Sequence, residues 1–332
     1  MKRQLLILSL LASFNLNAQD IHFSQFYNAP LLQNPSLAGA TEKTEASILY
    51  RSQWKSITIP YKTFAANGSI RLQRNRKQKN YFGIGLSFFQ DQSGDGQLST
   101  MNGSFNLAFH VEVARYHHLG LGIQTGFGQR KIDASGFQWG SQYEGTAFNA
   151  NMPTGESFMT QNIAYLDFAG GLVWTFDNNS GKIHVDRDEL SKGNAGIAIY
   201  HFNRPDFSFN QTGEKLQIKY VAHANFIQSL GRSKFAVQPG FFTYFQGPNK
   251  QIYLGSLVRY DLLLESKYSK SIDNIGASLG AYWRMGDALV INTLFEFGNL
   301  GIGIGYDANI SSLRKASYGR GGFELSIRYT NR

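Results

Sequence analysis

Residues 81–89 read YFGIGLSFF, and this short stretch decides the fold class. Its even-numbered positions from 82 to 88 are Phe, Ile, Leu and Phe, whereas the odd-numbered positions between them are Gly, Gly and Ser. Successive side chains of a β-strand point to opposite faces of the sheet. The stretch therefore predicts a strand with one large apolar face and one face of very small residues.

The same period of two recurs along the chain. Residues 118–128 (HLGLGIQTGFG), 300–306 (LGIGIGY) and 323–329 (FELSIRY) alternate in the same way. The segments with this pattern are 45–53, 61–73, 81–90, 98–113, 118–130, 159–177, 194–202, 216–230, 233–246, 250–264, 275–284, 288–297, 299–307 and 322–330. They number fourteen, and most have about the nine to eleven residues that a tilted strand needs to cross a bilayer.

Two all-β classes fit this pattern, a transmembrane β-barrel and a soluble sandwich or solenoid. Beyond the leader no run of 18 apolar residues occurs, which excludes a helical membrane protein. The mean hydropathy of −0.28 fits both classes, because a barrel places apolar residues at every second position. The face of small residues suits a curved wall facing a crowded or wet lumen, and a closed sheet leaves no strand edge exposed to lipid. We therefore predict an all-β fold, an antiparallel transmembrane barrel of about 14 strands.

The first 18 residues have the pattern of a signal peptide. Lys2 and Arg3 form a basic start, residues 5–16 are mainly apolar, and Ala18 supplies a small residue before the expected cut. We expect three parts: a signal peptide at 1–18, a periplasmic or plug segment at 19–44, and the barrel at 45–332. The sequence contains no cysteine, so disulfides play no part in its stability.

Five stretches carry a resemblance to a known family. They are FSQFYNAPLLQNPSLAGA (23–40), YRSQW (50–54), GIGLSFFQDQSGDG (83–96), GAYWRMGDAL (280–289) and GYDANISSLRKASYGRGGFELSIRY (305–329). In this order they resemble the PorP/SprF family, outer-membrane proteins of the type IX secretion system in gliding and secreting Bacteroidetes. The family often has Ser-His-Glu before the last strand. The matching stretch of this chain is Gly321-Gly322-Phe323-Glu324, so that histidine is absent.

The resemblance implies a role in protein export rather than in chemistry. It implies an outer-membrane protein that binds secreted cargo with a type B C-terminal sorting domain, such as gliding adhesins, and helps its export or cell-surface attachment. The implied partners are that cargo, components of the secretion machinery and the lipid bilayer. We expect no enzymatic activity, no cofactor, no metal site and no nucleic-acid partner. The alternative is an outer-membrane transporter of hydrophobic small molecules, similar to the fatty-acid porins, which share the strand number and the N-terminal plug.

The segment before the first strand is rich in aromatic residues and amides. Its aromatic residues require burial, and a proline after Asn34 forces an extended or turn path. We predict that it packs inside or under the barrel at the inner mouth as a partial plug; the alternative is a disordered lead-in. The candidate plug residues are Phe23, Phe26, Tyr27, Asn34 and Pro35.

The 131–158 connection contains several aromatic residues, which are costly to expose unless they pack together or meet a partner. Two interpretations stay open, a loop folded onto the barrel mouth and a cargo-binding surface. The candidate cargo contacts are Phe137, Trp139, Tyr143, Phe148 and Phe158. If the first strand begins on the periplasmic side, this connection and those at 203–215 and 308–321 face the cell exterior.

Overall fold

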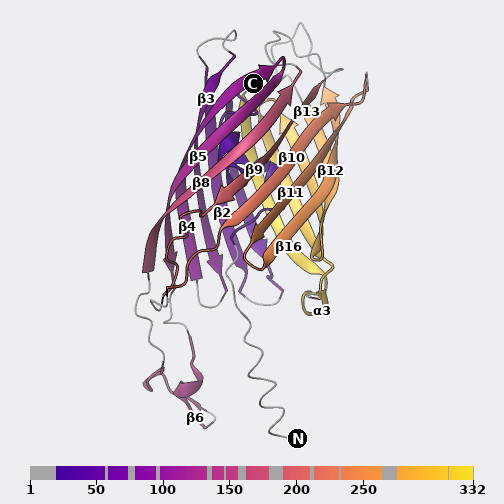
Figure 1. Cartoon of the computed structure of the whole chain (residues 1–332). Helices are drawn as coiled ribbons and strands as arrows, with labels where there is room; N and C mark the ends of the chain where they lie inside the picture. The colour runs from indigo at the N-terminus through magenta and orange to yellow at the C-terminus, as the bar shows by residue number, and fades with distance from the viewer. Residues whose placement is uncertain are drawn as a thin grey trace, which may run out of the picture.

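The computed structural model is a closed antiparallel β-barrel (Figure 1). It describes residues 20–56, 59–73, 79–94, 98–132, 137–145, 147–155, 162–178, 190–209, 213–231, 233–263, 275–312 and 314–331. The ladder runs from each barrel strand to the next along the chain, and the last strand closes the barrel by pairing with the first. The expected signal peptide, residues 1–18, lies outside the described residues. Among the described residues, no helix is long and apolar enough to cross a membrane.

The barrel strands are β1 (Thr44–Gln53), β2 (Tyr61–Leu72), β3 (Tyr81–Ser93), β4 (Leu98–Ala114), β5 (His117–Lys131), β8 (Asn162–Asp177), β9 (Ser191–Tyr200), β10 (Lys219–Ser229), β11 (Phe235–Gln246), β12 (Asn249–Leu263), β13 (Ile275–Arg284), β14 (Ala288–Phe297), β15 (Leu300–Asn309) and β16 (Arg320–Asn331). The predicted fold class is confirmed, because each predicted segment matches one of these strands. The pattern did not predict the two-residue strands β6 (Tyr143–Glu144) and β7 (Ala147–Phe148), which form a separate small sheet.

The two faces of each strand differ as the alternation predicts. On β3, Leu86 is 64% exposed, whereas Gly85 and Ser87 on either side of it are buried. The same pattern of exposed apolar residues recurs on the other strands, with Leu121 on β5 and Leu279 on β13 as examples. Lipid stabilises apolar side chains that are exposed on the outer wall of a barrel. The outer face is therefore the lipid-facing face.

The barrel has two unlike ends. At the end that we call the terminal mouth, β1 begins at Thr44 beside Asn331 near the chain's C-terminus. At the other end, which we call the loop mouth, lie the connections after β1, β3, β5, β9, β11, β13 and β15. The loop mouth is at the bottom of Figure 1, where β6 and the short helix α3 (Arg314–Ser317) are labelled.

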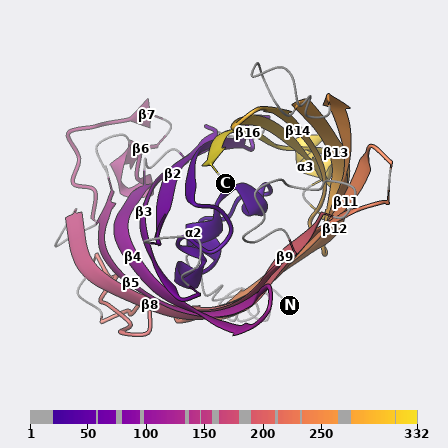
Figure 2. The same ribbon diagram turned by 90° about the horizontal axis from the view of Figure 1, so that it is seen from above.

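Residues 20–43, which we call the lumen segment, run through the inside of the barrel (Figure 2). The segment contains η1 (Phe26–Asn28), α2 (Pro30–Gln33) and η2 (Pro35–Leu37). Asp20 lies at the loop mouth beside His201, and the segment ends at the terminal mouth, where β1 starts. The segment therefore extends from one mouth to the other, because its first residues bind groups at the loop mouth and its last residues lead into β1. Its expected position at the inner mouth stays a prediction, since it depends on which mouth faces the periplasm.

We predict that the loop mouth faces the cell exterior, and cysteine labelling tests this. The chain has no cysteine, so an introduced one is unique. Tyr318, at the loop mouth, is 87% exposed, and the side chain of Lys79, between β2 and β3, is 77% exposed. On intact cells, a membrane-impermeant maleimide should label Tyr318→Cys but label Lys79→Cys only after lysis. The reverse pattern would invert the orientation.

Candidate functional site

Four charged side chains meet inside the barrel, and each is at most 2% exposed. Arg51 on β1 pairs with Asp307 on β15 (Nη2–Oδ2, 3.0 Å) and with Glu324 on β16 (Nε–Oε1, 3.1 Å). Arg284 at the end of β13 pairs with the same Asp307 carboxylate (Nη1–Oδ2, 2.9 Å). We call these four residues the charge cluster. Burial makes an unpaired charge very costly, so each member depends on the others.

The charge cluster binds the first part of the lumen segment. Glu324 accepts hydrogen bonds from the backbone N–H groups of Ser24 (2.7 Å) and Gln25 (2.9 Å). The hydroxyl of Ser24 donates to Asp307 (2.7 Å), and Arg51 donates to a backbone carbonyl of the segment. Hydrogen bonds to ionised groups are stronger than those between neutral groups. The cluster therefore connects three strands of the wall to the chain inside it.

A second set of contacts, which we call the latch, joins Asp20 to the loop mouth. The Asp20 carboxylate lies 2.7 Å from His201 Nε2 and 3.4 Å from Lys219 Nζ, and its backbone N–H donates to Gln246 Oε1 (3.1 Å). His201 Nδ1 lies 2.8 Å from a carboxylate oxygen of Asp167. The imidazole thus lies between two carboxylates, one from the segment and one from the wall.

The latch carries full charges at neutral pH. Burial by itself lowers the pKa of His201, but Asp20 and Asp167 outweigh it and raise this pKa to about 9. Burial by itself raises the pKa of Asp20, but His201 and Lys219 outweigh it and hold that pKa below its ordinary value. The Asp20–His201 contact is therefore an ion pair at pH 7.

The predicted plug aromatics pack against the wall. Phe26 stacks on Phe242 (ring centroids 5.3 Å apart) and meets Tyr282 edge-on (5.2 Å). Tyr27 stacks on the same tyrosine (6.0 Å) and lies edge-on to Phe26 (5.8 Å), so the three rings contact one another. Phe23 is 3% exposed and belongs to a separate cluster with residues of β1 and β2. Burial of these large rings contributes apolar stabilisation of the segment inside the lumen.

The predicted Asn34-Pro35 pair forms the turn that starts η2. The side-chain oxygen of Asn34 accepts from the backbone N–H of Ser36 (3.0 Å), which caps the short helix. Its amide nitrogen donates to the backbone carbonyls of Leu172 (2.9 Å) and Ile197 (3.1 Å). One side chain therefore shapes the segment and attaches it to β8 and β9.

The lumen segment lies so close to the inner wall that some wall positions have room only for glycine. A Cβ atom on Gly122 would lie 2.3 Å from the backbone nitrogen of Ser36, and one on Gly83 would lie 1.9 Å from the carbonyl oxygen of Ala38. Real Cβ atoms do not approach other atoms so closely, and a backbone atom cannot rotate away. The face of small residues seen in the sequence is thus the surface on which the lumen segment lies.

The predicted cargo contacts lie apart from the wall. Phe137 and Trp139 pack edge to face (5.3 Å), and Tyr143 on β6 packs against Phe148 on β7 (5.6 Å). Tyr143 is 45% exposed and Phe148 is 37% exposed. Figure 1 shows the small sheet clear of the barrel at the loop mouth. Phe158 lies outside the described residues.

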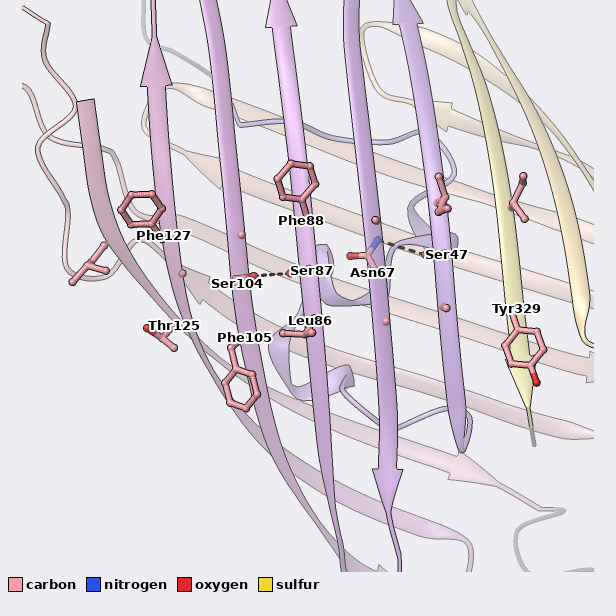
Figure 3. Close-up of a pocket in the computed structure, with 18 residues that line it drawn as sticks. Ser47, Asn67, Leu86, Ser87, Phe88, Ser104, Phe105, Thr125, Phe127 and Tyr329 are labelled. Carbon is pink, nitrogen blue, oxygen red and sulfur yellow. Dashed lines mark hydrogen bonds between the residues drawn. The ribbon is translucent and has the colours of Figure 1, made fainter. Parts of the chain in front are cut away.

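A groove of about 750 Å³ lies on the outer wall over β1 to β5 (Figure 3). The rings of Phe88, Phe105 and Phe127 line it, whereas the Ser87–Ser104 hydrogen bond (2.6 Å) lies on the buried face. The groove opens on the face that the exposed apolar residues assign to lipid. It therefore belongs to the membrane-facing surface and not to the lumen.

The charge cluster and the latch were missed from the sequence. Arg51, Arg284, Asp307 and Glu324 all lie within the stretches that carry the family resemblance. The available signal was a charged residue at a lumen-facing position of a strand that also has a lipid-facing apolar face. Periodicity shows that such a residue points inward, but not which charge it meets.

Comparisons with known proteins bear on this arrangement. A family model described as "Type IX secretion system membrane protein PorP/SprF" matches residues 15–329. No curated protein sequence matches the chain. Among solved structures, the TodX deltaS2S3 mutant monoaromatic hydrocarbon channel is 9% identical with a TM-score of 0.46, covering 92% of this chain and 94% of that one. BamA from Haemophilus ducreyi lacking POTRA domains 1–3 is 9% identical with a TM-score of 0.43, covering 87% and 70%. A Pseudomonas aeruginosa FadL homologue is 9% identical with a TM-score of 0.41, covering 90% and 93%. At these scores the structural likenesses carry no argument about function.

The contact of the lumen segment with glycine can be tested by adding one methyl group. We expect Gly122→Ala to destabilise the folded barrel by about 1–3 kcal/mol, because the new Cβ would overlap the backbone of the segment. Gly301→Ala is the matched control, since a Cβ there would come no closer than 3.5 Å to its nearest neighbour, Leu294, which is ordinary van der Waals contact. Urea unfolding in detergent measures both. Equal stability of the two variants would contradict the close contact.

The latch should open at alkaline pH. The pKa of His201 is raised in the folded state. The stability that the charged imidazole contributes to the latch is therefore complete below about pH 6.5, the ordinary histidine pKa, and is lost as the pH rises through about 9. The pKa of Asp20 is lowered in the folded state. The stability that its carboxylate contributes is therefore present above the ordinary aspartate pKa and is lost only in acid. We expect chymotryptic cleavage after Phe23 to accelerate between pH 6.5 and 9.5, relative to an unfolded peptide at the same pH. The His201→Gln variant should be cleaved rapidly at every pH in this range. A relative cleavage rate that does not change with pH in the wild type would refute the latch.

Proposed function

The chain belongs to the PorP/SprF family of type IX secretion system membrane proteins, and from this premise we propose that it binds secreted cargo at the loop mouth of an outer-membrane barrel. The cargo is a secreted protein with a type B C-terminal sorting domain, such as a gliding adhesin. The barrel helps its export or holds it on the cell surface. In this proposal the chain is a binding protein and not an enzyme.

The packing of the lumen segment against the inner wall is the observation that carries the proposal. Residues 23–40 are almost all buried, and they contact strands on opposite sides of the barrel. The charge cluster, the latch and the aromatic contacts all keep the segment in place. With the segment inside, the useful surfaces of the protein are its two mouths rather than a channel between them.

The small β6–β7 sheet supports a binding role for the loop mouth. Exposed aromatic residues are frequent anchors of protein interfaces, because they bury a large area at low entropic cost. Tyr143 and Phe148 lie side by side and are exposed at the end where the long connections gather. They form an apolar surface that lies away from the lipid-facing wall.

The transporter alternative is less well supported. A carrier of hydrophobic molecules needs an open lumen or a lateral gap in its wall. Here the strand ladder is closed, and the lumen segment is bound by charged and aromatic groups of that wall.

Affinity isolation from native membranes in mild detergent, followed by mass spectrometry, tests the proposed function. We expect a large secreted protein to co-purify with the wild type and to be lost when its C-terminal domain is deleted. Tyr143→Ala/Phe148→Ala should lower its recovery by about tenfold, because paired aromatic anchors contribute much of an interface's binding energy. The control is Phe235→Ala/Tyr260→Ala, which removes an aromatic pair at the terminal mouth. A barrel that is isolated without protein cargo, with lipid alone, would overturn the proposal.

A further inference from the structure

The outer wall over β2 to β5 changes from apolar to polar within a few residues of the groove shown in Figure 3. The strand registers align four groove residues in one row across these strands, Ala66, Phe88, Gly103 and Phe127. Four residues nearer the loop mouth, the same registers align a second row, Lys62, Gln92, Ser99 and Lys131. We call the second row the polar row. The period of two places both rows on the outer face of the sheet.

The two lysines at the ends of the polar row have no acidic partner within the described part of the chain. Lys62 and Lys131 are both exposed, and neither pairs with a carboxylate there, unlike Lys79, Lys192 and Lys219. The polar row itself contains no acidic residue. The chain as a whole has a formal net charge of +9. This part of the surface therefore favours an anionic partner.

The groove lies on the membrane side of the polar row and is apolar. Its volume of about 750 Å³ is within the range of about 300–1,000 Å³ that is usual for ligand sites. Leu86, Phe105 and Phe127 line it beside Gly68. A Cβ atom on Gly68 would meet no atom closer than the backbone oxygen of Glu45, at 3.9 Å. The groove therefore has room for an apolar chain beside its aromatic rings.

The spacing between the two rows matches the dimensions of a lipid. A strand rises about 3.3 Å per residue, so four residues separate the polar row from the groove by at most about 13 Å. One leaflet of the hydrocarbon core is about 15 Å thick, half of the whole. A lipid whose headgroup lies at the lysines therefore has its acyl chains at the depth of the groove. Lys62 and Lys131 are three strand spacings apart, about 14 Å, so their long side chains can approach one headgroup from two sides.

We propose that the groove and the polar row together bind one anionic, phosphate-bearing lipid of the leaflet that meets the loop mouth. An acyl chain lies in the groove, and Lys62 and Lys131 neutralise the phosphate. Lysine binds phosphate as a point charge, and lysines near a membrane surface attract anionic lipids. The occupant comes from the bilayer, because the groove opens on the lipid-facing wall. This contact is separate from cargo binding, since it lies on the outer wall and not on the β6–β7 sheet.

Native mass spectrometry of the purified full-length barrel in detergent tests the proposal. The probes are dimyristoyl phosphatidylglycerol and dimyristoyl phosphatidylcholine, which have the same acyl chains and differ in net charge. We expect one anionic lipid to bind per barrel and the zwitterionic lipid to bind at least about tenfold more weakly, because both lysines attract the net charge. Lys62→Gln/Lys131→Gln should weaken the anionic lipid by about tenfold. The control Lys234→Gln/Lys250→Gln removes the same charge from exposed positions on the other side of the chain's ladder, before β11 and on β12, and should leave binding unchanged.

A second pair of variants tests the groove itself. Gly68→Leu places an apolar side chain in the groove and should weaken binding of the anionic lipid by about threefold or more, through loss of apolar contact with the acyl chain. Ala281→Leu makes a similar exchange at an exposed position of β13 and is the matched control.

Glycerol phosphate, which has the phosphate without the acyl chains, should not displace the lipid at millimolar concentration. Displacement by glycerol phosphate would indicate a site for free phosphate and would overturn the proposal. Equal binding of the two lipids, or unchanged binding in either Lys62→Gln/Lys131→Gln or Gly68→Leu, would also overturn it. Because no cargo is present in this assay, its failure would leave the proposed function at the loop mouth untouched.

Discussion

The charge cluster of Arg51, Arg284, Asp307 and Glu324 is the interaction on which the rest of the structure depends. Its members lie on β1, β13, β15 and β16, so it joins the closing seam of the barrel to the chain within. Ion pairs so deeply buried add little net stability, but loss of one partner leaves a charge without compensation, at a cost of about 3–5 kcal/mol. Such a network therefore selects one arrangement of segment and wall over others.

The lumen segment and the wall each explain features of the other. The aromatic rings of the segment are unfavourable in water, and they pack instead against aromatic rings of β11 and β13. The inward glycines weaken a strand when nothing fills the space beside them. Here the backbone of Ser36 and Ala38 occupies that space. The barrel thus encloses its own N-terminal chain, and its inward glycines match the backbone that lies against them.

The barrel has two chemically different ends. The loop mouth has exposed aromatic residues and the charged latch, whereas the terminal mouth has a cavity of about 180 Å³ lined by cations that pair with carboxylates.

The amino-acid sequence by itself determined the fourteen barrel strands and the two faces that each one shows, because a period of two is a local property and lipid stabilises the outward apolar residues of every strand. It also indicated that Phe23, Phe26 and Tyr27 require burial. Only the tertiary structure decided the path of the lumen segment and the partners of its charges. The bond from Ser24 to Glu324 joins residues 300 positions apart, and no local pattern encodes which inward charge such a residue will meet. The end of the barrel that the first residues of the segment reach could not be read from the sequence for the same reason. The end at which Asp20 lies depends on His201, Lys219 and Gln246, which only the closure of the barrel brings together.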